Sequence, residues 1–334
     1  SSDLLSIMPT SLWSSTTGHV LASCSRIRAP AVATPPTGEA GRLFIADNQN
    51  GILGSPATAG QGEVLIEGSE FARNGAGDGY SHNMYLGSYA KFTLRGSYAH
   101  QGRVGHLVKS RAYLNLILYN RLTDEAGGSA SYELNLPNGG TSLVIGNVIA
   151  QSETTQNPSL IAYGEEGLPA GYSGQLFVVN NTFLNLKKTG TFVSSAAGTT
   201  VVLRNNLFWN GGTLSSQATA QLAGNFDSST MGDPQLVSAA SYDVRLKPGS
   251  PCIDKGVVPG VGGGQPLEAT QEYSGLATTP RRSRNGSAGA RRPSSSASRP
   301  TSASTSTPQT CSSMAWAIPW KPCGISSLAS CNRT

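Results

Sequence analysis

The 334-residue sequence has little of what helical, membrane-spanning or metal-binding proteins are rich in. Only 13% of the residues are charged and 7% are aromatic, whereas helical bundles and coiled coils are rich in Ala, Glu, Lys and Leu. No uninterrupted apolar run approaches the roughly 18 residues of a membrane-spanning helix, so we expect no membrane span. The four His and five Cys lack metal-ligand spacings such as Cys-x-x-Cys, so no metal site is predicted from them. With 40 Gly and 19 Pro, the composition is that of a turn-rich, mostly β chain.

Acidic residues are absent after Glu272, so the two parts of the chain differ in charge. The stretch that follows holds eight Lys and Arg residues, and removing these eight from the formal charge of +5 leaves −3 for the first 272 residues. Because the main body is mildly acidic, we expect no nucleic-acid partner.

The two ends also differ from the middle in composition. Residues 1–40 form an irregular segment without the charged start and apolar core of a signal peptide. Residues 263–334 form a basic Ser/Thr/Pro/Arg-rich tail. We expect this tail to be disordered or non-native, because it can bury too little apolar surface to offset the entropy of ordering it. Residues 41–262 are expected to form one domain.

A short pattern recurs seven times in the middle of the chain. Each copy is a β-branched run that ends in Gly or Asn, followed by a small polar residue. The polar positions are Ser69, Ser97, Asn120, Asn147, Asn181, Asn206 and Asn225, at spacings of 28, 23, 27, 34, 25 and 19 residues. These periods are too short for βαβ units. An antiparallel sandwich would need hairpin signals at closer spacing, and it would not explain the recurring Asn. The pattern predicts an all-β parallel β-helix, a solenoid of about seven or more coils. Its Asn residues would form a ladder at a turn with left-handed backbone.

A second short strand follows each repeat, and its alternation predicts which side chains face inward. Met84 and Leu86, then Val108, then Leu134 and Leu136 are expected inside. The opposite parity is expected to face solvent. The outward residues predicted in this way are Asn83, Tyr85, Lys109, Arg111, Glu133 and Asn135.

If each coil in this region has 24 residues, side chains at that spacing lie above one another on one outer face. The columns predicted in this way are Tyr85–Lys109–Glu133, Gly87–Arg111–Asn135 and His82–His106.

The residue types on this face suit an acidic polysaccharide as partner, because Lys and Arg bind carboxylates, Tyr contacts sugar faces and Asn binds hydroxyls. One candidate reaction is β-elimination from a uronic acid, which needs a carboxylate neutraliser, a base and an acid for the leaving oxygen. Lys109 is the candidate base, Arg111 the neutraliser, and Tyr85 or His106 the acid. The candidate substrate-binding residues are His82, Asn83, Arg95, Glu133 and Asn135.

Other hypotheses stay open. Lys109 and Glu133 could form a plain surface ion pair, in which case the solenoid would be a non-catalytic glycan-binding or structural surface module. A glycoside hydrolase would need two carboxylates, for which Asp124 and Glu133 are the nearby candidates. Glu133 could also help to hold Ca²⁺.

The coils LYNRLTDE, IGNVIAQ, VNNTFLN and RNNLFWN resemble those of right-handed parallel β-helix proteins of the pectin-lyase-like superfamily, over residues 42–247. The resemblance implies a right-handed solenoid. We expect a secreted or periplasmic protein that is a monomer.

Within that superfamily, GHLVKSRAYLNLILYN is similar to the Lys-Ser strand of the alginate lyase and chondroitinase B family. The lysine of that family's Asn-Lys-Ser motif is its Brønsted base, which implies the same role for Lys109. Val108 stands where the motif has Asn. The next coil, SYELNLPNGG, lacks the family's Arg-His-Gly, so Arg111 or Arg95 would have to supply the arginine. The resemblance implies a polysaccharide lyase.

Overall fold

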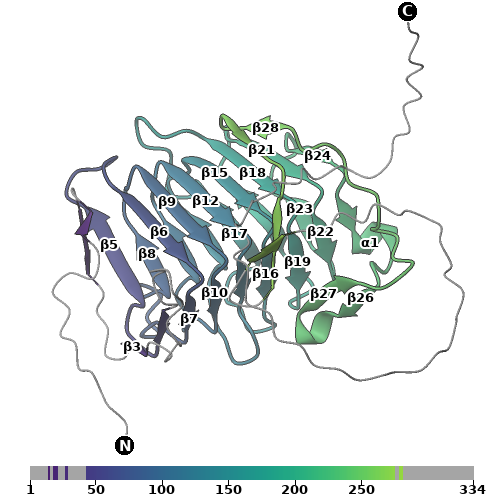
Figure 1. Ribbon diagram of the computed structural model, residues 1–334, viewed down its shortest axis with the longest axis horizontal. Coiled ribbons are helices and arrows are strands. Elements are labelled where there is room, and N and C mark those ends of the chain that lie inside the picture. The colour runs from purple at the N-terminus through teal and green to yellow at the C-terminus, as the bar shows by residue number, and fades with distance from the viewer. Residues whose placement is uncertain (1–13, 16–17, 22–26, 29–42, 275–277, 281–334) are drawn as a thin grey trace, which may run out of the picture.

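The computed structural model describes residues 14–15, 18–21, 27–28, 43–274 and 278–280, with side chains for 43–274. Three long sheets wind around a common interior, and each regular coil adds one strand to each sheet. In Figure 1 the coils succeed one another along the long axis, from the purple N-terminal end to the green C-terminal end. The predicted all-β parallel β-helix is confirmed, because the strands of successive coils pair in parallel in all three sheets.

The three sheets are named here by their strands in chain order. Sheet A contains β1 (Ser14–Ser15), β2 (Gly18–Leu21), β5 (Ile52–Pro56), β8 (Met84–Leu86), β11 (Val108–Ser110), β14 (Leu134–Leu136), β17 (Ser159–Tyr163), β20 (Thr191–Ser195) and β23 (Thr213–Ser215). Sheet B contains β3 (Ile27–Arg28), β4 (Phe44–Ala46), β7 (Glu70–Ala72), β10 (Tyr98–His100), β13 (Arg121–Thr123), β16 (Val148–Gln151), β19 (Thr182–Asn185), β22 (Leu207–Trp209) and β25 (Phe226–Asp227). Sheet C contains β6 (Glu63–Glu67), β9 (Lys91–Arg95), β12 (Leu114–Leu118), β15 (Thr141–Ile145), β18 (Gln175–Val179), β21 (Thr200–Arg204) and β24 (Gln221–Ala223).

The N-terminal segment that was predicted to be irregular contains three of these strands. β1 and β2 pair with each other, β2 pairs with β5, and β3 pairs with β4. All three pairings are antiparallel, so these strands extend the edge of the β-helix without adding a further coil.

The predicted polar ladder is confirmed between sheets C and B. The Asn147 Oδ1 accepts hydrogen bonds from the backbone N and the Nδ2 of Asn120, at 2.8 and 3.0 Å, and Asn181 does the same for Asn147. The left-handed backbone, however, belongs to the residue before each ladder position, such as Tyr119 with φ 57° and Asn180 with φ 56°. The ladder Asn therefore contributes hydrogen bonds, and its predecessor makes the turn.

The side chains that were predicted to face inward from sheet A do so. Met84, Leu86, Val108, Leu134 and Leu136 are all fully buried. Farther along the interior the rings of the aromatic residues stack, with the centroids of Phe183 and Phe208 at 4.9 Å. Burial of each such side chain stabilises the fold by roughly 1.5–3 kcal/mol.

After the last coil the chain returns along the outside of the β-helix. The elements of this part are α1 (Ser228–Met231), β26 (Leu236–Ser238), η1 (Ala239–Ser241), β27 (Asp243–Leu246), β28 (Val261–Gly262), β29 (Gln265–Pro266), β30 (Gln271–Tyr273) and β31 (Thr278–Pro280). The hairpin of β26 and β27 lies near β19 and β22 at the green end of Figure 1 and packs on sheet B around Leu184 and Leu207.

Residues 257–270 form a strap across the outer face of sheet C. Leu267 and Ala269 are fully buried in a cluster that includes Phe177, and Thr270 N donates to the Tyr119 hydroxyl at 3.1 Å. An added Cβ at Gly262 would lie 2.4 Å from the Phe177 ring, so only glycine allows this close approach. Part of the predicted tail, residues 263–274, therefore packs on the domain. Apart from 278–280, the rest of that tail lies outside the described residues. Within the described chain, no helix is long and apolar enough to cross a bilayer.

Candidate functional site on sheet A

The outer face of sheet A brings Tyr85 and Lys109 side by side. The two residues are direct partners in the pairing of β8 with β11, which confirms the predicted 24-residue coil between them. The next coil is longer, and Lys109 is paired with Asn135, 26 residues on. The predicted column from Lys109 to Glu133 is therefore wrong by two positions.

Glu133 does not face solvent, contrary to the prediction. It precedes β14 at the corner where the chain enters sheet A, between Leu107 and Leu160 of the adjacent coils, and is fully buried with them. Asn83, at the same position of its own coil, is also fully buried, and its Oδ1 accepts from Asn74 Nδ2 at 2.9 Å. Strand alternation fails here because the chain is still turning. Neither residue can contact a substrate on the outer face, and Glu133 cannot help to hold Ca²⁺ there.

The carboxylate pair considered for a hydrolase is enclosed in the protein. Asp124 and Glu133 are both fully buried. Burial, followed by the charge of Asp124, raises the pKa of Glu133 well above its ordinary value, and burial raises the pKa of Asp124 to about 6. Because neither carboxylate reaches the surface, this pair cannot cleave a polysaccharide on sheet A.

Arg95 lies on a different sheet from the other candidates. It is the last residue of β9 in sheet C and forms an ion pair with Glu67 of β6. It cannot replace the missing arginine beside Lys109. Of the two arginines considered for that place, Arg111 is the one that lies near Lys109.

Lys109 and Arg111 together hold one carboxylate, that of Glu166. The Lys109 Nζ donates to the Glu166 Oε1 at 3.2 Å, and the Arg111 Nη2 donates to the Glu166 Oε2 at 2.6 Å. The two cationic side chains are only 12% and 21% exposed, whereas the Glu166 side chain is 44% exposed. We call Lys109 and Arg111 the cationic fork.

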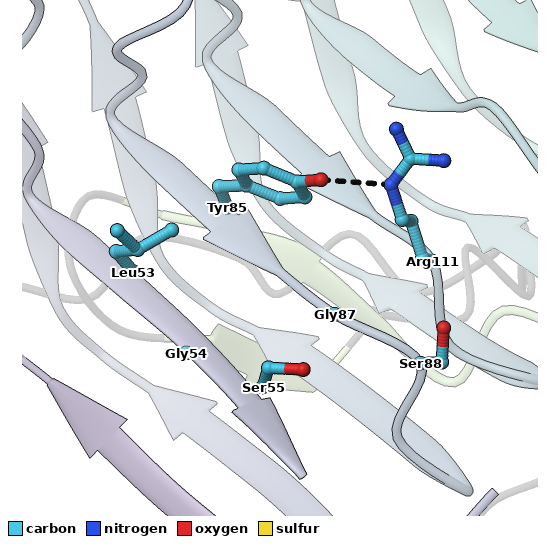
Figure 2. Close-up of a pocket in the computed structure, with 7 residues that line it drawn as sticks. All are labelled: Leu53, Gly54, Ser55, Tyr85, Gly87, Ser88 and Arg111. Carbon is cyan, nitrogen blue, oxygen red and sulfur yellow. Dashed lines mark hydrogen bonds between the residues drawn. The ribbon is translucent and has the colours of Figure 1, made fainter. Parts of the chain in front are cut away.

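Tyr85 lies next to both cations of the fork. Its hydroxyl accepts a hydrogen bond from the Arg111 Nε at 2.8 Å, and the Lys109 Nζ lies 5.3 Å from the centre of its ring. Figure 2 shows the phenol oxygen directed at Arg111 from the neighbouring strand. Beside it lies an open depression of about 430 Å³. The lining residues are Leu53, Gly54, Ser55, Tyr85, Gly87, Ser88 and Arg111.

Asn135 lies next to Lys109 as an outward residue, but it is covered by the segment 164–173, which joins β17 to β18. Its Nδ2 donates to Glu165, while its Oδ1 is buried without a hydrogen-bond partner. Asn138 accepts from the Arg111 Nη1 at 2.5 Å and so helps to orient the fork. No sequence pattern had pointed to Asn138, Glu165 or Glu166. The last two could have been noticed as an adjacent acidic pair within the Gly- and Pro-rich stretch GEEGLPAG.

The two histidines that were predicted to stack do so, but behind the fork. The rings of His82 and His106 lie 4.6 Å apart, and the His82 Nδ1 accepts from the His106 backbone N at 3.0 Å. Burial, assisted by nearby positive charge, lowers the pKa of His82 to about 4 and that of His106 to about 2. Both rings are therefore neutral at pH 7. His106 therefore holds no acidic proton for a leaving oxygen, and of the two acid candidates only Tyr85 remains. The His82 ring packs edge-on against the Tyr85 ring, with centroids 5.4 Å apart.

Among residues 43–274 no group of three or more His, Cys, Asp or Glu side chains is placed to hold a metal ion.

The family described as right handed beta helix region matches residues 45–227, more than half of the chain. The protein thus belongs to the right-handed β-helix family, and the handedness expected from the sequence is confirmed. No curated protein and no solved structure matches the chain.

Proposed function

We propose that this protein binds an acidic polysaccharide on the outer face of sheet A and cleaves it by β-elimination. The observation that carries the proposal is the cationic fork, which already holds a carboxylate at the edge of a tyrosine ring and an open depression. A uronic acid presents the same carboxylate, and its sugar ring offers a flat face for Tyr85.

The reaction needs three groups, and the fork supplies them together with Tyr85. Arg111 neutralises the uronate carboxylate, which makes the proton on the adjacent ring carbon more acidic. The Lys109 Nζ takes this proton, a carbon–carbon double bond forms, and the bond from the next ring carbon to the bridging oxygen breaks. The Tyr85 hydroxyl gives its proton to that oxygen, and transfer of a proton from Lys109 to Tyr85 restores the site.

One further argument supports this assignment. The Lys-Ser pair of β11 resembles the motif of the alginate lyase and chondroitinase B family, in which the lysine is the base. Polysaccharides of this class lie outside the cytoplasm, so the proposal includes a secreted or periplasmic location.

Substitution of Lys109 by Ala is expected to lower the rate of eliminative cleavage by about 10²–10⁴-fold, the usual contribution of a general base. Tyr85→Phe is expected to lower it similarly, and Arg111→Ala is expected to weaken binding as well. The measurement is the ultraviolet absorbance of the unsaturated product with alginate, pectate and glycosaminoglycans as substrates. Lys91→Ala is the matched control, because Lys91 is also an ion-paired surface lysine but lies on sheet C.

The assay also distinguishes the alternatives. Release of reducing sugar without the absorbance would indicate a hydrolase. Binding that depends on the fork, without any product, would indicate a non-catalytic module. Either result would contradict the eliminative mechanism.

A further inference from the structure

Glu166 makes the contacts that a bound uronate would make. Its two oxygens accept hydrogen bonds from the two different cations of the fork, although Glu166 is 57 and 55 residues away from Lys109 and Arg111 in the sequence. A carboxylate shared between an ammonium and a guanidinium in this way is what an acidic sugar offers to the same groups.

We infer that Glu166 is an internal stand-in for the substrate carboxylate, and that the Glu165–Glu166 part of the segment 164–173 is a gate which an acidic polysaccharide must displace. This inference rests on the proposed function. In the structure, the protein's own Glu166 occupies the place of the substrate carboxylate. The Lys109 amine donates to Glu166 and is therefore not free to accept a proton.

The segment covers Asn135, and the state of this residue supports the inference. Asn135 lies directly beside Lys109 on the face, is 1% exposed and keeps an unpartnered Oδ1. A buried polar atom without a hydrogen-bond partner destabilises the closed arrangement, and a sugar hydroxyl that bonds to the Asn135 Oδ1 would remove this cost. The polysaccharide would thus gain two partners under the segment, the fork and Asn135.

The contacts that hold the segment are compatible with opening. The Glu166 N donates to Pro137 O at 3.0 Å, and the Asn138 Nδ2 donates to Gly167 O at 3.2 Å. Glycines with positive φ lie at Gly164 and Gly171, close to either end, where the backbone can change direction without a side-chain clash.

A firmer anchor lies at the C-terminal end of the segment. The Tyr172 hydroxyl donates to Arg111 O at 2.7 Å, and its ring lies on that of Tyr113 with centroids 4.0 Å apart. We therefore expect the Glu165–Glu166 part to move, while Tyr172 keeps its place.

Removal of the internal carboxylate should strengthen binding of uronates. A tethered group competes at a local concentration in the millimolar range, and the apparent dissociation constant is the intrinsic one divided by the fraction of open molecules. For Glu166→Gln and Glu166→Ala we expect the affinity for a uronate hexasaccharide to rise by about 10-fold. The methyl-esterified hexasaccharide should gain nothing, because it has no carboxylate to compete for the fork.

The test is calorimetric titration of the full chain with galacturonate, mannuronate and glucuronate-containing hexasaccharides and with their methyl esters. Glu153→Gln is the matched control, because it makes the same charge change at an exposed position after β16 of sheet B. Amide hydrogen exchange at Glu166, whose N–H bonds to Pro137 in the closed state, should speed up in the wild type when the acid form binds.

The outcomes separate the inference from the proposed function. If the wild type binds and Arg111→Ala weakens binding, but the Glu166 variants bind equally or more weakly, Glu166 orients the fork and the gate is overturned. If neither the wild type nor the Glu166 variants bind any uronate, both the gate and the proposed function are overturned.

Discussion

Replacement of Glu133 by Leu is expected to raise the free energy of unfolding at pH 8 by about 1–3 kcal/mol, the usual cost of a buried polar group that has no hydrogen-bond partner. Both carboxylate oxygens of Glu133 are buried without a hydrogen-bond partner, and the side chain lies between Leu107 and Leu160. Leucine has a similar size and would continue this buried apolar column along the corner of sheet A. Chemical denaturation monitored by circular dichroism provides the measurement.

The stability gained by the Glu133→Leu variant should depend on pH, and the direction of this dependence follows from the raised pKa of Glu133. In the unfolded chain the carboxyl titrates near its ordinary pKa of 4.5, whereas burial and Asp124 keep it protonated to higher pH in the folded state. The folded state therefore binds the proton more tightly, and stability is lost as the pH rises from about 4.5 through the folded pKa. The advantage of the Glu133→Leu variant over the wild type should grow over the same interval. The free energy of unfolding of the variant should still decrease between about pH 4 and 6, because burial raises the pKa of Asp124 to about 6 in the folded state.

Two further variants test the cause of this gain. Glu133→Gln removes the charge but keeps a polar group, so it should flatten the pH dependence with a smaller gain at pH 8. Glu153→Gln, at an exposed position, should leave stability within about 0.5 kcal/mol. A Glu133→Leu variant less stable than the wild type at pH 8 would mean that Glu133 has a compensating partner in the folded protein.

Substitution of Asn147 by Ala is expected to destabilise the fold by about 3–5 kcal/mol, because several buried groups lose a partner at about 1–3 kcal/mol each. Asn147 is 1% exposed and lies in the middle of the ladder. Its Nδ2 donates to Ile117 O at 2.8 Å, and its Oδ1 accepts both the N and the Nδ2 of Asn120. The measurement is again the free energy of unfolding from denaturant titration.

The chain itself provides the matched control for this prediction. Ser occupies the ladder positions 69 and 97, where the Ser97 Oγ accepts from Ser69 N at 3.2 Å. Asn147→Ser should therefore keep part of the hydrogen bonding and lose clearly less stability than Asn147→Ala. An equal and small loss in both variants would show that the ladder contributes little to stability.

The ladder and the interior could be predicted because their signals recur. Each of the seven polar positions is one coil from the next, and the spacings in the sequence are the spacings of the hydrogen-bonded partners. A solenoid contacts mainly its nearest coils, so a one-dimensional period translates directly into three-dimensional neighbours.

The site was predicted only where the local coil length matched the assumed one. Tyr85 and Lys109 are neighbours because their coil has 24 residues, whereas the two extra residues of the next coil place Asn135 beside Lys109. Glu133 and Asn83 were misplaced for a second reason. Alternation holds within a strand, but both residues lie at the corner before one, where the side chain turns inward.

The sequence alone determined that the protein is a β-solenoid, that an Asn ladder stacks at one repeated turn position, and that Tyr85 and Lys109 share one outer face. Only the tertiary structure decided that Glu166 returns to Lys109 and Arg111, that residues 257–270 cover sheet C, and that Asp124 and Glu133 are enclosed. The reason is physical. Periodic contacts between adjacent coils are encoded by short-range spacing, whereas the path of a loop or strap depends on where distant, non-repeating side chains find charge and apolar partners.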